Sequence, residues 1–188
     1  VSRYYVNSGY TGEVIDQNDI AILRLSSYAP TTAQSYGLYL SDLTGVDFTV
    51  AGYGTRSTVG GAAGNTAPAG ARTGFLREGD NTYDYRWGDS AFGGFFTAED
   101  VNGENFFGFA EVDYSFVSDF DNGLAAQDQA CNIAAAVGAP TGFGCGVGLG
   151  AREVGIAGGD SGGPGFVDGK LASINSYGLT FGASYGDY

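Results

Sequence analysis

Short apolar stretches, each bounded by glycine-rich or polar turns, recur along the chain and predict β-strands. DIAILRL at 19–25 is an apolar run that ends in alternation, which predicts a strand buried on one or both faces. DFTVAGY at 47–53 predicts a second strand, interrupted by Gly52 and Gly54. Further strands are predicted at 106–112, 165–167 and 171–176, with a turn at Asp168-Gly169, and within 72–87 around a turn at 79–81.

One segment favours a helix. LAAQDQACNIAAAV at 124–137 is dense in Ala and Leu, with Asp121 or Asn122 as its candidate N-cap and Gly138 and Pro140 beyond its end. The small, polar stretch 55–70 predicts a surface loop. No internal repeat and no interdomain linker is visible. Many short strands, frequent turns and one helix predict an all-β fold, either a barrel or a sandwich.

The composition supports this class and excludes several functions. The 188 residues include 34 Gly, 13 Phe and 13 Tyr, which suits a β-protein with many tight turns. A net charge of −13 repels phosphate backbones and anionic lipids, so we expect no nucleic-acid partner and no membrane partner. The chain contains no His. This excludes His-ligated metals and a complete Ser-His-Asp triad within these residues.

The two cysteines, Cys131 and Cys145, favour a single disulfide. A zinc site would need further Cys or His ligands, which the chain lacks. A disulfide implies an oxidising compartment, so we expect a secreted, extracellular or periplasmic protein. Closing a loop of about 15 residues would stabilise the fold by roughly 3 kcal/mol. The alternative is two free, buried thiols in a cytosolic protein.

The most specific motif is GGDSGGP at 158–164. Glycines on both sides of Ser161 allow positive φ angles and a close approach of substrate. Such a turn can point several backbone N–H groups into one concavity, as an oxyanion requires. Asp160, beside the serine, could hold the turn through an internal ion pair. The alternative is a glycine-rich turn that happens to contain Ser and Asp.

A second motif is NDIAILRL at 18–25. A carboxylate at the mouth of a buried strand is partly desolvated and needs hydrogen bonds. Asp19 is therefore suited to orient an imidazole and to stabilise its protonated form. An ordinary strand-capping Asp is an equally open interpretation.

Together the two motifs resemble the trypsin/chymotrypsin family of serine proteases. The resemblance implies a double antiparallel β-barrel, with the end of barrel one at about 1–48 and barrel two at about 49–188, including an insertion within 55–105. It implies that Ser161 is the nucleophile and that Asp19 is the triad carboxylate. It further implies that the Gly159 and Ser161 amides form the oxyanion hole and that Asp160 matches the residue that pairs with a new amino terminus.

Other segments agree with the resemblance. AGYG at 51–54 resembles the family's GWG strand, and the Cys131/Cys145 pair resembles its disulfide after the intermediate helix. Ser176, Tyr177 and Gly178 resemble the SWG strand, which binds substrate backbone and forms one wall of the S1 pocket. Gly155 matches the base of that pocket. Because Gly155, Ile156 and Ala157 carry no charge, we expect a preference for apolar or aromatic P1 side chains.

The departures from the family are also informative. The family's His lies before the triad Asp, and its chains continue beyond the SWG strand. The chain therefore resembles a protease truncated at both ends, and we expect the His on additional sequence or on a separate chain. Without that base, these residues alone are predicted to be inactive.

Two residue groups have no motif of their own. Glu111, Asp113, Asp119 and Asp121 are more consistent with a solvated acidic loop than with a calcium site. Six phenylalanines are interpreted as core rather than as a ligand box, namely Phe92, Phe95, Phe96, Phe106, Phe107 and Phe109. The predicted function, a secreted serine endopeptidase acting on proteins or peptides, requires no cofactor and no metal. The alternatives are a catalytically inactive protease-like binding or structural module, an esterase, and an extracellular scaffold.

Overall fold

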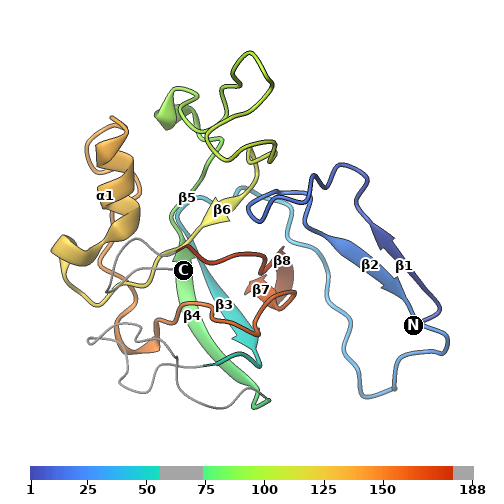
Figure 1. Cartoon of the computed structure of the whole chain (residues 1–188). Coiled ribbons are helices and arrows are strands. Elements are labelled where there is room, and N and C mark those ends of the chain that lie inside the picture. The colour runs from blue at the N-terminus through green and yellow to red at the C-terminus, as the bar shows by residue number, and fades with distance from the viewer. Residues whose placement is uncertain (56–73, 180–188) are drawn as a thin grey trace.

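The computed structural model describes residues 1–55 and 74–179, so most of the predicted loop at 55–70 lies outside the described residues. The described part is mostly sheet with few helices and no closed barrel, which confirms the all-β prediction at this level (Figure 1). The strands are β1 (Arg3–Val6), β2 (Ala21–Arg24), β3 (Val46–Gly52), β4 (Arg77–Tyr83), β5 (Tyr85–Arg86), β6 (Phe116–Val117), β7 (Pro164–Val167) and β8 (Lys170–Ile174).

A four-stranded antiparallel sheet, in the order β4-β3-β7-β8, forms the centre of the molecule. Phe48 and Val50 alternate with outward-facing residues along β3, and both are buried in one of two core clusters. Tyr83 stacks on Phe48 and its hydroxyl lies 2.5 Å from the Ser173 hydroxyl. The hairpin β7–β8 turns at Asp168-Gly169, as predicted, and both residues have positive φ.

The second core cluster is aromatic and lies against the helix. Tyr85, Trp87 and Phe92 are buried at its centre, with their rings in mutual contact. The prediction that six phenylalanines belong to the core is confirmed in part. Phe92 and Phe96 are buried and Phe107 is partly buried, whereas the other three are exposed, namely Phe95, Phe106 and Phe109.

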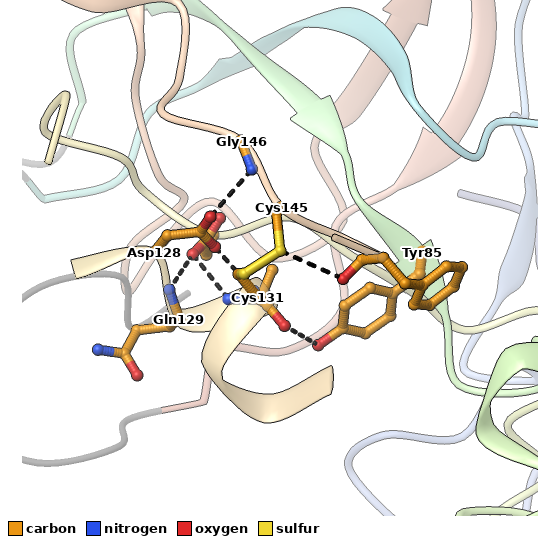
Figure 2. Close-up of a disulfide and its surroundings, with 9 residues drawn as sticks. Tyr85, Asp128, Gln129, Cys131, Cys145 and Gly146 are labelled. Carbon is orange, nitrogen blue, oxygen red and sulfur yellow. Dashed lines mark hydrogen bonds between the residues drawn. A yellow bond between two sulfur atoms is a disulfide. The ribbon is translucent and has the colours of Figure 1, made fainter. Parts of the chain in front are cut away.

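The helix α1 (Gln129–Ala136) is shorter than predicted because a 3₁₀ turn occupies Ala125–Gln127. Its N-cap is Asp128, not Asp121 or Asn122, since the Asp128 carboxylate accepts the Cys131 N–H at 2.7 Å. The predicted disulfide between Cys131 and Cys145 is present (Figure 2). Within residues 1–55 and 74–179, no helix has the length and hydrophobicity needed to cross a bilayer.

The first predicted strand forms but is not buried. β2 pairs with β1 in a separate two-stranded sheet whose residues are all exposed, and Figure 1 shows this hairpin projecting from the rest of the molecule. Its apolar side chains lie in solvent: Tyr4 is 70% exposed and Ile22 is 68% exposed. The sequence pattern specified a strand with apolar faces, and the described residues supply nothing to cover them.

Two further predictions were wrong. No strand forms at 106–112, because the Asn105 side chain accepts the Phe107 N–H and Gly108 adopts a positive φ, which closes a turn. No turn forms at 79–81, because β4 runs through these residues in register with β3. Gly79 serves close packing instead, since a Cβ there would meet the Val154 side chain at 2.5 Å.

Replacing both Cys131 and Cys145 with Ser is expected to lower the free energy of unfolding by about 3 kcal/mol, because the disulfide restricts the unfolded chain. Urea unfolding of the double variant and of the wild type measures this loss. Wild-type protein kept reduced should lose the same amount. A double variant as stable as the oxidised wild type would contradict the prediction.

Candidate functional site

The loop around Ser161 is a compact pair of turns. The Asp160 N–H donates to Ala157 O at 2.9 Å, and the Gly163 N–H donates to Asp160 O at 2.8 Å. Gly159 and Gly162, on either side, have φ values of 103° and 78°, in the region that favours glycine. Gly159 and Gly162 are therefore required by the backbone path, and this path leaves Ser161 exposed at the surface.

The Asp160 carboxylate anchors this loop to the end of β3. Its Oδ1 accepts the Gly54 N–H at 2.7 Å and its Oδ2 accepts the Ala157 N–H at 3.0 Å. A Cβ on either Gly52 or Gly54 would collide with the carboxylate, so glycine is required at both positions. The internal ion pair suggested for Asp160 is replaced by amide hydrogen bonds, because two backbone N–H groups reach the carboxylate and no charged side chain does within the described residues.

Two backbone donors at this loop remain available. Within the described part of the chain, neither the Gly159 N–H nor the Ser161 N–H has an internal acceptor, and the Ser161 hydroxyl has no hydrogen-bond partner. An oxyanion formed next to Ser161 needs such unpaired amides on the same turn as the attacking oxygen. Within the described residues, the loop therefore combines an exposed, unpaired hydroxyl with two unpaired backbone donors.

The loop continues the ladder between β7 and β8. The Gly162 N–H donates to Asn175 O at 2.7 Å, and the Asn175 N–H donates to Gly163 O at 2.8 Å. Asn175 is buried, and its side-chain amide also reaches Asp160 O at 3.4 Å. Ser161 is thus held one residue away from a backbone pair that is continuous with the central sheet.

Asp19 reaches the next residue on the same segment. The Ser176 hydroxyl donates to Asp19 Oδ2 at 2.6 Å, and Val14 O lies 3.4 Å from the same hydroxyl. Asn175 and Ser176 are consecutive, so the Ser161 loop and Asp19 both attach to one dipeptide. The structure brings these two predicted residues to the same segment but forms no hydrogen bond between them within residues 1–55 and 74–179.

A buried carboxylate holds the turn that presents Asp19. Asp16 accepts the Thr11 and Asn18 backbone N–H groups at 2.9 and 2.8 Å, and the Asp19 N–H donates to Asp16 O at 3.0 Å. Burial raises the pKa of Asp16, but the hydrogen bonds from Thr11 and Asn18 together outweigh it and hold this pKa below its ordinary value. Asp16 is therefore a structural carboxylate that sequence reasoning missed, and Asp19 remains exposed.

Tyr177 has a role in the core that the sequence did not reveal. Its hydroxyl accepts from Trp87 Nε1 at 3.0 Å, contacts the Ser115 hydroxyl at 3.1 Å and donates to Phe116 O at 3.1 Å. These bonds fix the segment from Ser176 to Gly178 against the aromatic core. Within the described residues, the backbone N–H and C=O groups of that segment have no internal partner, so they are free to pair with an extended peptide.

Gly155 is half-buried and directly precedes Ile156, which lines a large cavity. The cavity has a volume of about 620 Å³, and its lining includes Ile156, Ser176 and Tyr177, but not Ser161 or Asp19. Of the residues predicted to bind substrate, Ser176 and Tyr177 thus line one concave surface, whereas Gly155 and Gly178 do not. Ser161 and Asp19 also lie outside it.

The acidic residues highlighted by the sequence separate into two places. Glu111 and Asp113 are exposed, and Glu111 contacts the Gln17 and Asn18 side chains. Asp119 and Asp121 are buried, so the prediction of a solvated acidic loop was wrong for them. Their carboxylates lie close to that of Asp128, which follows the 3₁₀ turn at Ala125–Gln127. The sequence analysis had treated Asp128 only as part of the helix.

No protein-family model, curated protein or solved structure matches the chain. The functional interpretation consequently depends on the motifs and on the geometry described above.

The close packing of Gly52 against the Asp160 carboxylate gives a direct test of how tightly this carboxylate is held. Gly52→Ala is expected to lower the free energy of unfolding by about 1–3 kcal/mol, because its methyl group would collide with the Asp160 carboxylate. Gly158→Ala is the matched control, since a Cβ there meets nothing within 4 Å. Urea unfolding of both variants measures the difference in their free energies of unfolding. Equal stabilities would show that Gly52 is not tightly packed against Asp160.

Proposed function

We propose that the chain is the nucleophile-bearing part of a secreted serine endopeptidase of the trypsin/chymotrypsin type. The observation that carries the proposal is the dipeptide Asn175-Ser176, which binds the Ser161 loop on one residue and Asp19 on the next. The two motifs are 142 residues apart in the sequence. Their attachment to one segment is the arrangement that a shared catalytic centre requires.

In the proposed reaction, the Ser161 oxygen attacks the scissile carbonyl and an imidazole from outside these 188 residues takes its proton. The Gly159 and Ser161 amides stabilise the oxyanion. The imidazolium then gives the proton to the leaving amine, which leaves an acyl group on Ser161. Water hydrolyses this ester with the same imidazole acting as base and then as acid.

Asp19 is suited to orient that imidazole. Its Oδ2 is held by Ser176, whereas within the described residues its Oδ1 has no hydrogen-bond partner and the side chain is exposed. A fixed carboxylate with one free oxygen can accept an imidazole N–H and stabilise the imidazolium. Since the chain contains no His, the 188 residues alone are expected to have negligible activity.

The remaining features of the proposal follow from the same resemblance. The exposed β1–β2 hairpin is assigned to the end of a first barrel, and the central sheet to a second barrel that begins at about residue 49. The free backbone of Ser176, Tyr177 and Gly178 would pair with substrate. The disulfide supports an oxidising location, so we assign the protein to the extracellular space or the periplasm.

Labelling with a fluorophosphonate probe tests the nucleophile. In the native protein purified from its source, peptide mapping should find the probe on Ser161, and Ser161→Ala should abolish labelling. Ser118→Ala is the control that should label normally. The isolated 188-residue chain should label at least a hundredfold more slowly, because no base removes the hydroxyl proton.

Folded native protein whose Ser161 remains unlabelled would refute the enzyme and favour the catalytically inactive binding or structural module. The exposed apolar hairpin fits that alternative as well, because such a module would cover it with a partner chain. Labelled protein that turns over esters but not peptides would favour the esterase.

Substrate preference gives a second test. With Gly155, Ile156 and Ala157 at the proposed pocket base, no carboxylate is available to pair with a basic side chain. We expect kcat/KM for a peptide with Phe at P1 to exceed that for the matched Arg peptide by at least about tenfold, in proportion to a difference of about 1.4 kcal/mol. Equal or faster cleavage after Arg would contradict the assignment.

A further inference from the structure

Five carboxylates gather between the helix start, β4 and the loop after Cys145. Asp119, Asp121 and Asp128 are buried and each offers an oxygen within 4.8 Å of the other two. Glu153 is buried beside them, and Asp84 is half-buried with its Oδ2 accepting the Asp119 N–H at 3.0 Å. This concentration of negative charge in one interior region requires compensation.

Backbone amides supply part of that compensation. Asp119 accepts from Gln129 and Ala130, at the first turn of α1. Asp128 accepts from Cys131 and from Gly146, so its carboxylate bridges the helix start and the loop beyond the disulfide, as Figure 2 shows. Glu153 accepts the Asp121 and Leu149 N–H groups.

In the described part of the chain, no cationic side chain completes the compensation. Within the described residues, no Lys or Arg forms an ion pair with any of the five carboxylates, and the neighbouring Arg152 pairs instead with Asp80 at 2.7 Å. Burial and mutual repulsion raise the pKa of Asp84 to about 9 and that of Asp121 to about 8.

A second observation concerns one oxygen in the cluster. Asp121 is 6% exposed, and its Oδ1 is buried without any hydrogen-bond partner in the described residues. The residue lines a cavity of about 430 Å³ together with Asp84 and Glu153. Gly148, whose φ is 81°, packs directly against Asp121 and Glu153, because a Cβ on it would collide with both side chains. An unpaired buried carboxylate oxygen costs free energy unless something binds it.

We propose that Asp119, Asp121 and Asp128 bind a calcium ion. Calcium prefers carboxylate and carbonyl oxygens at about 2.3–2.6 Å, so two of its ligands can lie up to about 5 Å apart. Magnesium holds its ligands at about 2.0–2.1 Å and would need closer oxygens. Zinc is disfavoured, because the chain has no His and both thiols form the disulfide.

The ion would tie the segment at 119–121 to the start of α1 and to the loop after Cys145. This site is distinct from the Ser161 loop and does not depend on the proposed peptidase function. Its failure and the failure of that function are therefore separate experimental results.

Isothermal titration of the full 188-residue chain, oxidised and freed of metal with chelator, tests the site. We expect one Ca²⁺ per chain, with Mg²⁺ binding at least tenfold more weakly. At a Ca²⁺ concentration a hundred times Kd, Tm should rise by about 5–10 °C.

Asp121→Asn separates the metal site from a purely structural cluster. It replaces the ionisable carboxyl with a neutral amide of the same shape, so the Ca²⁺ affinity should fall at least tenfold while the metal-free variant should melt no lower than the metal-free wild type. Asp113→Asn removes an equal charge from an exposed position and should leave Ca²⁺ binding unchanged. Asp121→Ser provides a second variant if Asp121→Asn does not fold.

Absence of stoichiometric Ca²⁺ binding by the folded wild type would overturn the proposal. Undiminished binding by either Asp121 variant would overturn it as well, because the ion would then be held elsewhere. Equal affinity for Mg²⁺ would exclude the calcium-sized site.

Discussion

The hydrogen bonds of the Asp160 carboxylate are the constraint on which the Ser161 loop depends. One carboxylate joins the end of β3 to the turn at 157–163, through the Gly54 and Ala157 amides. Hydrogen bonds to a charged acceptor are stronger than neutral ones, and here they occupy both oxygens of a half-buried group. The glycines at 52 and 54 leave room for the carboxylate, and the glycines at 159 and 162 allow the path around Ser161. The glycines at all four positions thus serve one anchor.

From that anchor, the central sheet extends to the other half of the candidate site. The pairing of Gly162 and Gly163 with Asn175 continues the β7–β8 ladder, and Ser176 then carries the connection to Asp19. Tyr177 fixes the following residues to the aromatic core through its hydroxyl. Within the described residues, the backbone N–H and C=O groups of Ser176, Tyr177 and Gly178 have no internal partner, so the segment after β8 has a free backbone edge. The exposed hairpin β1–β2 stands in contrast, with apolar side chains and no core of its own.

The acidic cluster shows a different balance of forces. Its carboxylates are placed where backbone amides converge, at the start of α1 and around Gly146 and Leu149. Amide dipoles compensate several of the oxygens but leave the Asp121 Oδ1 unpaired. The same residues hold the disulfide loop against the helix, so charge in this region is coupled to the packing of the aromatic core next to it.

The sequence by itself determined the β-rich class, the strands at β3, β7 and β8, the disulfide and the turn that presents Ser161, because local propensity, glycine positions and cysteine number specify these features. It did not determine that the β1–β2 hairpin is exposed or that Gly79 packs against Val154. Both features depend on which segment, distant in the sequence, lies next to these residues. The bond between Asp19 and Ser176 and the meeting of Asp119, Asp121 and Asp128 were decided only by tertiary structure. Their partners come from separate segments, and only the packing of those segments sets the distance between two side chains.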